Sequence, residues 1–167
     1  MGFTHYYRFY KRPLQQKNFE KFRKTFATVA EEIKLLYGSL PRYSNSGGDY
    51  YTDQPLEIRG GFGKGKPIIN ETTIWFNGDE KDDMNHETFS IDWSWEDKED
   101  PFDFCKTARK PYDLLVCASL ISFARHFGRD SFRASSDGKM ADWLPAIQLY
   151  HGVLDFDATK IVDRIIR

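Results

Sequence analysis

The sequence predicts a single α+β domain: a mixed, mostly antiparallel sheet of about five strands with helices packed mainly on one face. Three observations support this fold class. Segments in which polar and apolar residues alternate, as they do in strands, recur from the start of the chain to near its end. Two long segments between them carry apolar residues at helical spacing. A chain of 167 residues, 40% of them hydrophobic, is large enough for one domain with a buried core.

The N-terminal part of the chain predicts a strand followed by a helix. Alternation over residues 3–10 predicts the strand. One face of this strand consists of Phe3, His5, Tyr7 and Phe9. Apolar residues then recur every three or four positions over residues 15–37, which predicts an amphipathic helix that stops at Gly38. Residues 42–53, rich in Ser, Asn, Gly and Tyr, are predicted to form a long loop.

The middle of the chain predicts three further strands. Residues 56–60 form a short one, and residues 72–77 and 86–93 form an antiparallel pair joined by an acidic loop. The run GGFGKGKP at residues 60–67 is interpreted as a turn, because a phosphate-binding loop has Ser or Thr after its lysine and leads directly into a helix. The acidic loop, residues 79–85, lacks the ligand spacing of a calcium loop and is interpreted as solvated.

The junction before the central helix is the first candidate site. A buried apolar helix is predicted from Pro111 onward, after an acidic linker at residues 95–104. Its capping position falls on Lys110, whose side chain cannot accept hydrogen bonds from the first helical amides. Four cationic or thiol residues crowd this end: Cys105, Lys106, Arg109 and Lys110. Free amides and cations together favour a bound phosphate or carboxylate, unless Asp113 satisfies the amides and pairs with Arg109 while the lysines point into water.

The C-terminal part predicts a last strand at residues 132–135 and a helix capped by Asp142. A short helix with an apolar stripe is predicted at residues 157–166. We therefore expect one domain over residues 1–154 and a helical extension over residues 155–167. The extension is expected to pack on the domain or on a second copy of the chain, so the sequence leaves a homo-oligomer open.

Composition and motifs argue against several functional classes. A formal net charge of −1 gives no strong sign of nucleic-acid binding by the whole protein. No signal peptide or transmembrane segment is evident, and two cysteines make no disulfide framework, so we expect a cytoplasmic protein with reduced thiols and no membrane partner. The four histidines are scattered and no CxxC or HExxH motif occurs, so neither a metal nor a cofactor is expected.

Polar residues at strand ends and element junctions are the candidate site residues. The ligand-binding candidates are Arg8, Cys105, Lys106, Arg109, Lys110 and Asp137. The acid or base candidates are His5, His86 and Glu87. Glu87 falls on the apolar face of its strand, so it requires a partner, either His5 or the cations before the central helix, or else a bulge that turns it to water.

Several of these segments carry a resemblance to a known family. The segments are GFTHYYRF at residues 2–9, IWFNG at 74–78, HETF at 86–89, FCKTARKPYD at 104–113 and SSDG at 135–138, the last followed by a helix with Trp143. In these segments the chain resembles a family of uncharacterised bacterial and viral proteins. FCKTARKPYD is the most diagnostic of them, and the resemblance spans the chain up to about Leu154. It implies no particular activity.

Three functions are open on this sequence. The first is binding of a small anionic ligand, phosphorylated and for example a nucleotide, at the basic start of the central helix. The second is an enzyme of the hydrolase or phosphoesterase type in which His5, His86 or Glu87 acts as acid or base. The third is a structural or interaction protein with a buried polar network, for example an ion pair between Glu87 and Arg109.

Overall fold

The structure is a computed structural model that describes residues 2–10, 16–40, 56–92 and 102–167. The loop predicted at residues 42–53 lies outside these ranges. Within them the chain folds into helices and short strands, which confirms the predicted α+β class. In chain order these elements are β1 (Thr4–Phe9), α1 (Gln16–Gly38), β2 (Ile58–Arg59), β3 (Ile68–Ile69), β4 (Thr73–Gly78), β5 (Phe89–Asp92), β6 (Phe102–Lys106), α2 (Asp113–Phe127), β7 (Phe132–Ser136), α3 (Met140–Leu154) and α4 (Thr159–Ile165).

The strands form two antiparallel sheets. In the first, β1 lies between β6 and β7, and His5 is paired with Cys105 on one side and Ser136 on the other. In the second, β4 pairs with β2, β3 and β5. The predicted hairpin is confirmed, because β4 and β5 are antiparallel with Phe76 opposite Phe89. The glycine-rich run between β2 and β3 forms a short turn, as predicted, and no helix follows it.

β6 is a strand that the sequence prediction missed, because its residues fell within or just after the expected acidic linker. Phe102 and Phe104 are exposed, whereas Cys105 is fully buried, so the strand does alternate between two faces. Both phenylalanine rings lie beside the Tyr6 ring on the neighbouring strand, each with centroids 6.5 Å apart. The strand is stabilised by its pairing with β1. The acidic sequence before it gave no indication of this pairing.

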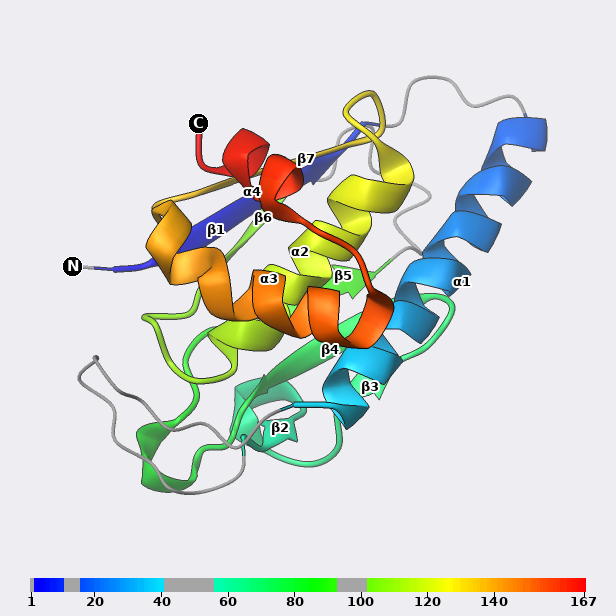
Figure 1. Ribbon diagram of the computed structural model, residues 1–167. Helices are drawn as coiled ribbons and strands as arrows, with labels where there is room; N and C mark the ends of the chain where they lie inside the picture. The colour runs from blue at the N-terminus through cyan, green and yellow to red at the C-terminus, as the bar shows by residue number, and fades with distance from the viewer. Residues whose placement is uncertain (1, 11–15, 41–55, 93–101) are drawn as a thin grey trace.

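α2 is the centre of the hydrophobic core because it is apolar nearly all round. Its fully buried side chains include Leu115, Val116, Ala118, Leu120 and Ile121. Figure 1 shows α2 next to α3 with strands behind it, and α2 also contacts α1, α4 and β7. A helix enclosed on every side needs apolar residues on every side, which explains its composition. None of the helices in the described ranges combines the length and apolarity needed to cross a membrane.

The apolar stripes of α1 and α4 are buried in the same core. On α1 the stripe consists of Phe26, Val29, Ile33 and Leu36, all 0% exposed. On α4 it consists of Ile161, Val162 and Ile165, which pack where α4 meets α2, α3 and β7. Of the two packings expected for the C-terminal helix, the structure shows the one against the domain.

A half-buried carboxylate connects three of the helices. Glu32 on α1 accepts hydrogen bonds from the Tyr150 hydroxyl on α3 at 2.6 Å and from His126 Nε2 on α2 at 2.7 Å. Arg125 Nη1 lies 3.5 Å from the same carboxylate. Partial burial alone would raise the pKa of Glu32, but these hydrogen bonds and the Arg125 charge outweigh it and hold the pKa below its ordinary value.

We expect the Glu32→Gln substitution to weaken the pH dependence of stability. Because the pKa of Glu32 is lower in the folded chain, its contribution is full above the pKa of an unfolded glutamate and is lost as the pH falls through the folded pKa. The free energy of unfolding in urea, measured from about pH 6 to about pH 3, should therefore fall less steeply in Glu32→Gln. Glu31→Gln, which removes an exposed charge next to Glu32, is the control. Equal pH profiles for the two variants would contradict this role.

Candidate functional site

A tight turn at Thr107–Lys110 positions the residues that the sequence singled out. Ala108 and Arg109 both have left-handed backbones, with φ of 51° and 58°. Lys110 N closes the turn by donating to Thr107 O at 3.0 Å. Thr107 N and Ala108 N donate to Phe3 O at 3.0 and 3.3 Å, which ties the turn to the entrance of β1. Two consecutive non-glycine residues with left-handed backbones are strained. The two hydrogen bonds to Phe3 O offset the free-energy cost of this conformation.

The start of α2 differs from the predicted one. The helix begins at Asp113 rather than Pro111, and its cap residue is Tyr112. The amides of Asp113, Leu114 and Leu115 donate to the carbonyls of the three preceding residues, Lys110, Pro111 and Tyr112, at 2.9–3.3 Å. The turn before α2 therefore satisfies the amides that were expected to be free for an anion.

The two cations of the turn have partners of their own. Lys110 is buried, and its ammonium donates to the Asp83 carboxylate at 2.7 Å and to the Asp83 carbonyl. Arg109 is exposed, lies over the Phe3 ring at 4.2 Å, and its Nε is 3.3 Å from the Asp142 carboxylate. The alternative prediction of an Arg109 pair with Asp113, with the lysines in water, is therefore also wrong for these residues.

Glu87 precedes β5 and does not bind either expected partner. Its carboxylate accepts a hydrogen bond from the backbone N–H of Lys106 at 2.6 Å, at the end of β6. Its carbonyl accepts from the Tyr112 hydroxyl at 2.6 Å and from the Cys105 thiol at 3.4 Å. His86 is exposed. The acid or base candidates His5, His86 and Glu87 therefore have separate partners and share no described contact with one another.

The other ligand-binding candidates are dispersed along the first sheet. The Lys106 side chain lies against Gly2, where a Cβ would be 2.5 Å from its Cε atom. Arg8 lies over the Phe102 ring at 5.3 Å. Asp137 accepts a hydrogen bond from Thr4 N at 3.2 Å. The Cys105 side chain is buried, and burial next to acidic residues raises the pKa of its thiol, so Cys105 is not the activated thiol that its basic neighbours suggested.

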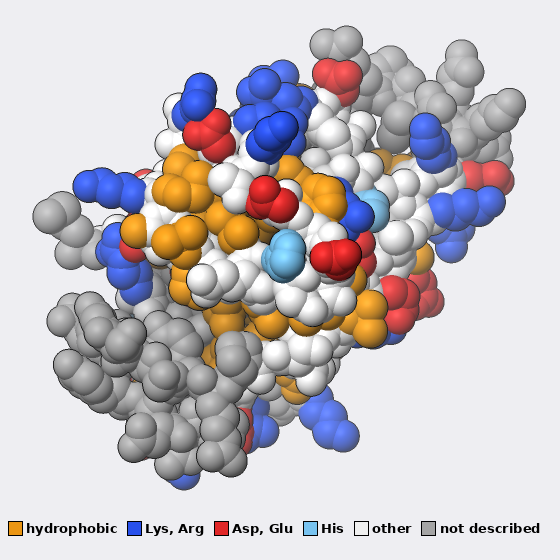
Figure 2. All heavy atoms as spheres, in the orientation of Figure 1, with side chains coloured by type: hydrophobic (Ala, Val, Ile, Leu, Met, Phe, Trp, Pro, Cys, Tyr) orange, Lys and Arg blue, Asp and Glu red, His pale blue; other side chains and the backbone are white. Residues whose placement is uncertain are grey.

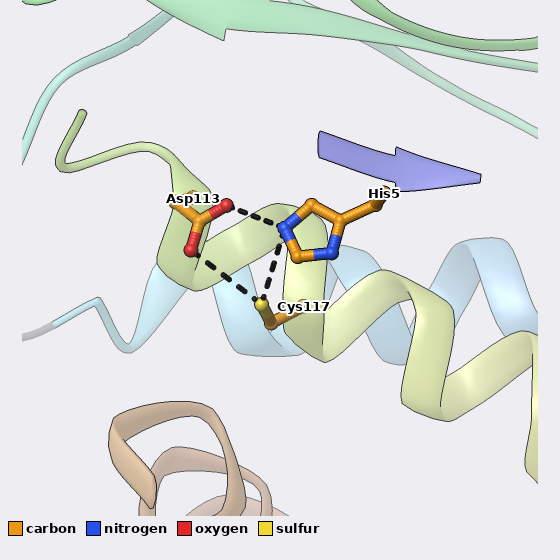
Figure 3. A group of neighbouring side chains, drawn as sticks. All are labelled: His5, Asp113 and Cys117. Carbon is orange, nitrogen blue, oxygen red and sulfur yellow. Dashed lines mark hydrogen bonds and ion pairs between the residues drawn. The ribbon is translucent and has the colours of Figure 1, made fainter. Parts of the chain in front are cut away.

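The polar contact that does form at this junction is a buried cluster of His5, Asp113 and Cys117, shown in Figure 3. His5 Nε2 lies 2.7 Å from Asp113 Oδ1 and 3.8 Å from Cys117 Sγ, which lies 3.6 Å from Asp113 Oδ2. The Thr107 hydroxyl donates to Asp113 Oδ1 at 2.5 Å. Burial, followed by the nearby Asp113 charge, raises the pKa of Cys117, so its thiol is protonated and is no nucleophile.

The sequence prediction placed His5 on the apolar face, as observed, but did not identify its partners. Asp113 and Cys117 are four residues apart on α2, so they lie on one face of the helix. This four-residue spacing was the one feature of the sequence that indicated that Asp113 and Cys117 lie side by side. Nothing in the sequence placed that face against β1, and the partners could not be found without the packing of α2.

A second site is a half-open cavity of about 70 Å³ where α2, β7 and α4 meet. We call it the arginine pocket, and its lining residues are Ala124, Arg129, Phe132, Arg133, Ala134, Ile161, Arg164 and Ile165. Figure 2 shows Lys and Arg side chains gathered over the edge where Figure 1 draws α4 and β7. The lining of the pocket thus combines apolar residues with three arginines.

Two of the three arginines, Arg133 and Arg164, are oriented by backbone carbonyls, and Arg133 also by an aromatic ring. Arg133 Nε donates to Arg129 O at 3.3 Å, and its guanidinium lies over the Tyr10 ring at 5.0 Å. Arg164 Nε donates to Lys160 O at 3.1 Å. Among the described residues, no carboxylate pairs with any of the three. The sequence prediction did not select them because they are separated along the chain and converge only when α4 packs on β7.

Comparisons with known proteins assign no function to this chain. No protein-family model, curated protein or solved structure matches this chain. The resemblance to a bacterial and viral family therefore stays a prediction. Three of its segments do meet at the junction, since Thr107 N donates to Phe3 O and Lys106 N donates to the Glu87 carboxylate.

Ala108→Gly is expected to raise the free energy of unfolding by about 1 kcal/mol, because glycine adopts the left-handed backbone without steric cost. The same change at Ala27, inside α1, should lower it by about 1 kcal/mol, because glycine is a poor helix former. Urea denaturation of both variants measures the two effects. Destabilisation by Ala108→Gly would show that this turn is not strained.

Lys110 is expected to matter more for stability than Arg109, because Lys110 is buried and Arg109 is exposed. Lys110→Ala removes a buried stem and a charge-assisted hydrogen bond, so it should cost about 2–4 kcal/mol. Arg109→Ala removes an exposed ion pair and a cation–π contact, so it should cost about 1 kcal/mol. Urea denaturation curves of the two variants give both values. A larger loss in Arg109→Ala would contradict the partner assignment.

Proposed function

We propose that this protein binds a small anionic, phosphate-bearing ligand, and that the ligand occupies the arginine pocket. The observation that carries the proposal is the convergence of Arg129, Arg133 and Arg164 on one cavity without a carboxylate partner among the described residues. The class of ligand is the one expected from the sequence. The location differs from the expected one, because the amides and cations at the start of α2 already have partners.

The charge of the pocket supports an anionic ligand. Three like charges that line one cavity repel one another. A phosphate group placed among them would relieve the repulsion. Each guanidinium offers several N–H donors in a planar fork, a geometry that suits the bidentate binding of phosphate oxygens.

The floor of the pocket supports a ligand with an organic part. Phe132, Ile161 and Ile165 form an apolar base beneath the arginines. The cavity of about 70 Å³ has room for a phosphate group and little more, so the rest of the ligand would extend through its open side. Small-molecule sites commonly combine such an apolar lining with a few oriented polar groups.

Binding without turnover is the better reading of this pocket. The described part of its lining consists of arginine and apolar residues, with no His, Cys, Asp or Glu that would act as acid, base or nucleophile. The hydrolase alternative relied on His5, His86 and Glu87, which have separate partners. The structural alternative describes the junction better, where His5, Asp113 and Thr107 form a buried polar network.

The cellular setting is part of the same proposal. We expect a cytoplasmic protein, because its two cysteines are free and buried, as is usual in a reducing compartment. Phosphorylated metabolites and nucleotides are abundant there. A second copy of the chain is not required, since the described pocket is built from residues of one chain.

Calorimetry and thermal unfolding with phosphate, pyrophosphate and a mononucleotide, at constant ionic strength, test the proposal. We expect saturable binding that raises Tm. Arg133→Ala and Arg164→Ala should each weaken binding about 10-fold or more, because a hydrogen bond to a charged group contributes about 1.5–3 kcal/mol. Arg23→Ala, an exposed arginine on α1, is the control for the loss of one positive charge.

A fourth variant separates this site from the one expected at the start of α2. If Arg109→Ala abolishes binding while Arg133→Ala retains it, the ligand binds at the junction and the location is wrong. If none of the three anions binds, the proposed function itself is wrong.

A further inference from the structure

We infer that His5, Asp113 and Cys117 form a binding site for Zn²⁺ or for a transition metal with the same ligand preferences. The three residues come from β1 and from the first two turns of α2. Their donor atoms are one imidazole nitrogen, one carboxylate oxygen and one sulfur, all within 4.8 Å of one another. Nitrogen, oxygen and sulfur of these residue types are the donors found in protein zinc sites.

The distances between the donors are close to those of a tetrahedral site. Zinc binds sulfur at about 2.3 Å and nitrogen or oxygen at about 2.0–2.2 Å, so neighbouring donors lie roughly 3.3–3.7 Å apart. Cys117 Sγ lies 3.8 Å from His5 Nε2 and 3.6 Å from Asp113 Oδ2. Figure 3 shows the three groups facing one another around a common centre. An ion there requires only small side-chain movements, mainly a separation of His5 from Asp113.

The two oxygens of Asp113 have different surroundings. Oδ1 accepts the Thr107 hydroxyl at 2.5 Å as well as His5 Nε2 at 2.7 Å. Oδ2 faces Cys117 and would be the metal ligand. Thr107 would then keep its hydrogen bond and orient the carboxylate, which is the role that outer groups have in metal sites.

The imidazole ring of His5 is also held in place. Its ring packs edge-on against Phe3 and Trp143, with centroids 5.0 and 5.3 Å away. His5 Nδ1 is buried and has no hydrogen-bond partner among the described residues. A metal at Nε2 requires the ring proton to move to Nδ1, and this change of tautomer breaks no hydrogen bond at Nδ1. The ring is therefore oriented by packing, and a metal at Nε2 would replace the hydrogen bond from Nε2 to Asp113 Oδ1.

Charge balance favours a divalent ion in this buried position. One carboxylate and one thiolate would neutralise Zn²⁺, with neutral imidazole as the third ligand, so the complex carries no net charge. The thiol proton of Cys117 is released to solvent when its sulfur binds the metal. No fourth His, Cys, Asp or Glu joins the cluster within the described part of the chain, so a water molecule would take the fourth position.

Substitution by Co²⁺ tests this site directly, because Co²⁺ bound to thiolate absorbs in the near ultraviolet and tetrahedral Co²⁺ absorbs in the visible. The full chain is purified, its zinc content measured, and the chain then refolded with one equivalent of Co²⁺, since the site is buried. We expect one metal ion per chain and both absorption bands. Cys117→Ala should lose the thiolate band. Cys105→Ala, which removes the other buried thiol, should keep it.

Further variants guard against a folding defect. His5→Gln and Asp113→Asn retain similar shape and should each weaken metal affinity by about 10-fold or more, with circular dichroism to confirm the fold. If Cys117→Ala fails to fold, Cys117→Ser replaces it and should likewise lose the thiolate band. The inference is overturned if no stoichiometric metal binds after purification or refolding, or if the band survives in the folded Cys117 variant. The cluster would then be a hydrogen-bonded structural contact only.

Discussion

The carboxylate of Asp113 connects β1, the turn after β6 and the start of α2. It accepts hydrogen bonds from His5 and Thr107, and Cys117 lies against its second oxygen. A carboxylate in this sheltered position requires such donors, because desolvation without them is expensive. The backbone of Ala108 and Arg109 is strained. These contacts, together with the hydrogen bonds to Phe3 O, stabilise the turn in that conformation.

The same contacts explain why the expected anion site did not form at the helix start. A helix N-terminus attracts anions when its amides are free. Here the preceding turn supplies the acceptors, and Lys110 and Arg109 are drawn to Asp83 and Asp142. The junction is consequently a structural centre, whereas the three arginines of the arginine pocket have no carboxylate partner among the described residues.

Much of the fold could be predicted because it follows local rules. The buried face of β1, the apolar stripe of α1 and the β4–β5 pair all obey the period of their element. β6 could not be predicted in the same way, because its alternation is short and lies beside an acidic run. The candidate site was predicted only in part: His5 was correctly placed on a buried face, whereas its partners and the three arginines were not identified.

By itself the sequence determined the α+β class, the faces of the main helices and strands, and the enclosed position of α2, because side-chain periodicity and hydrophobic burial act between near neighbours. Only the tertiary structure decided which polar groups meet. Hydrogen bonds, ion pairs and metal coordination act over a few ångströms. They therefore depend on packing, which brings His5 to Asp113 although 108 residues separate them, and places Arg164 at the cavity that Arg133 also lines.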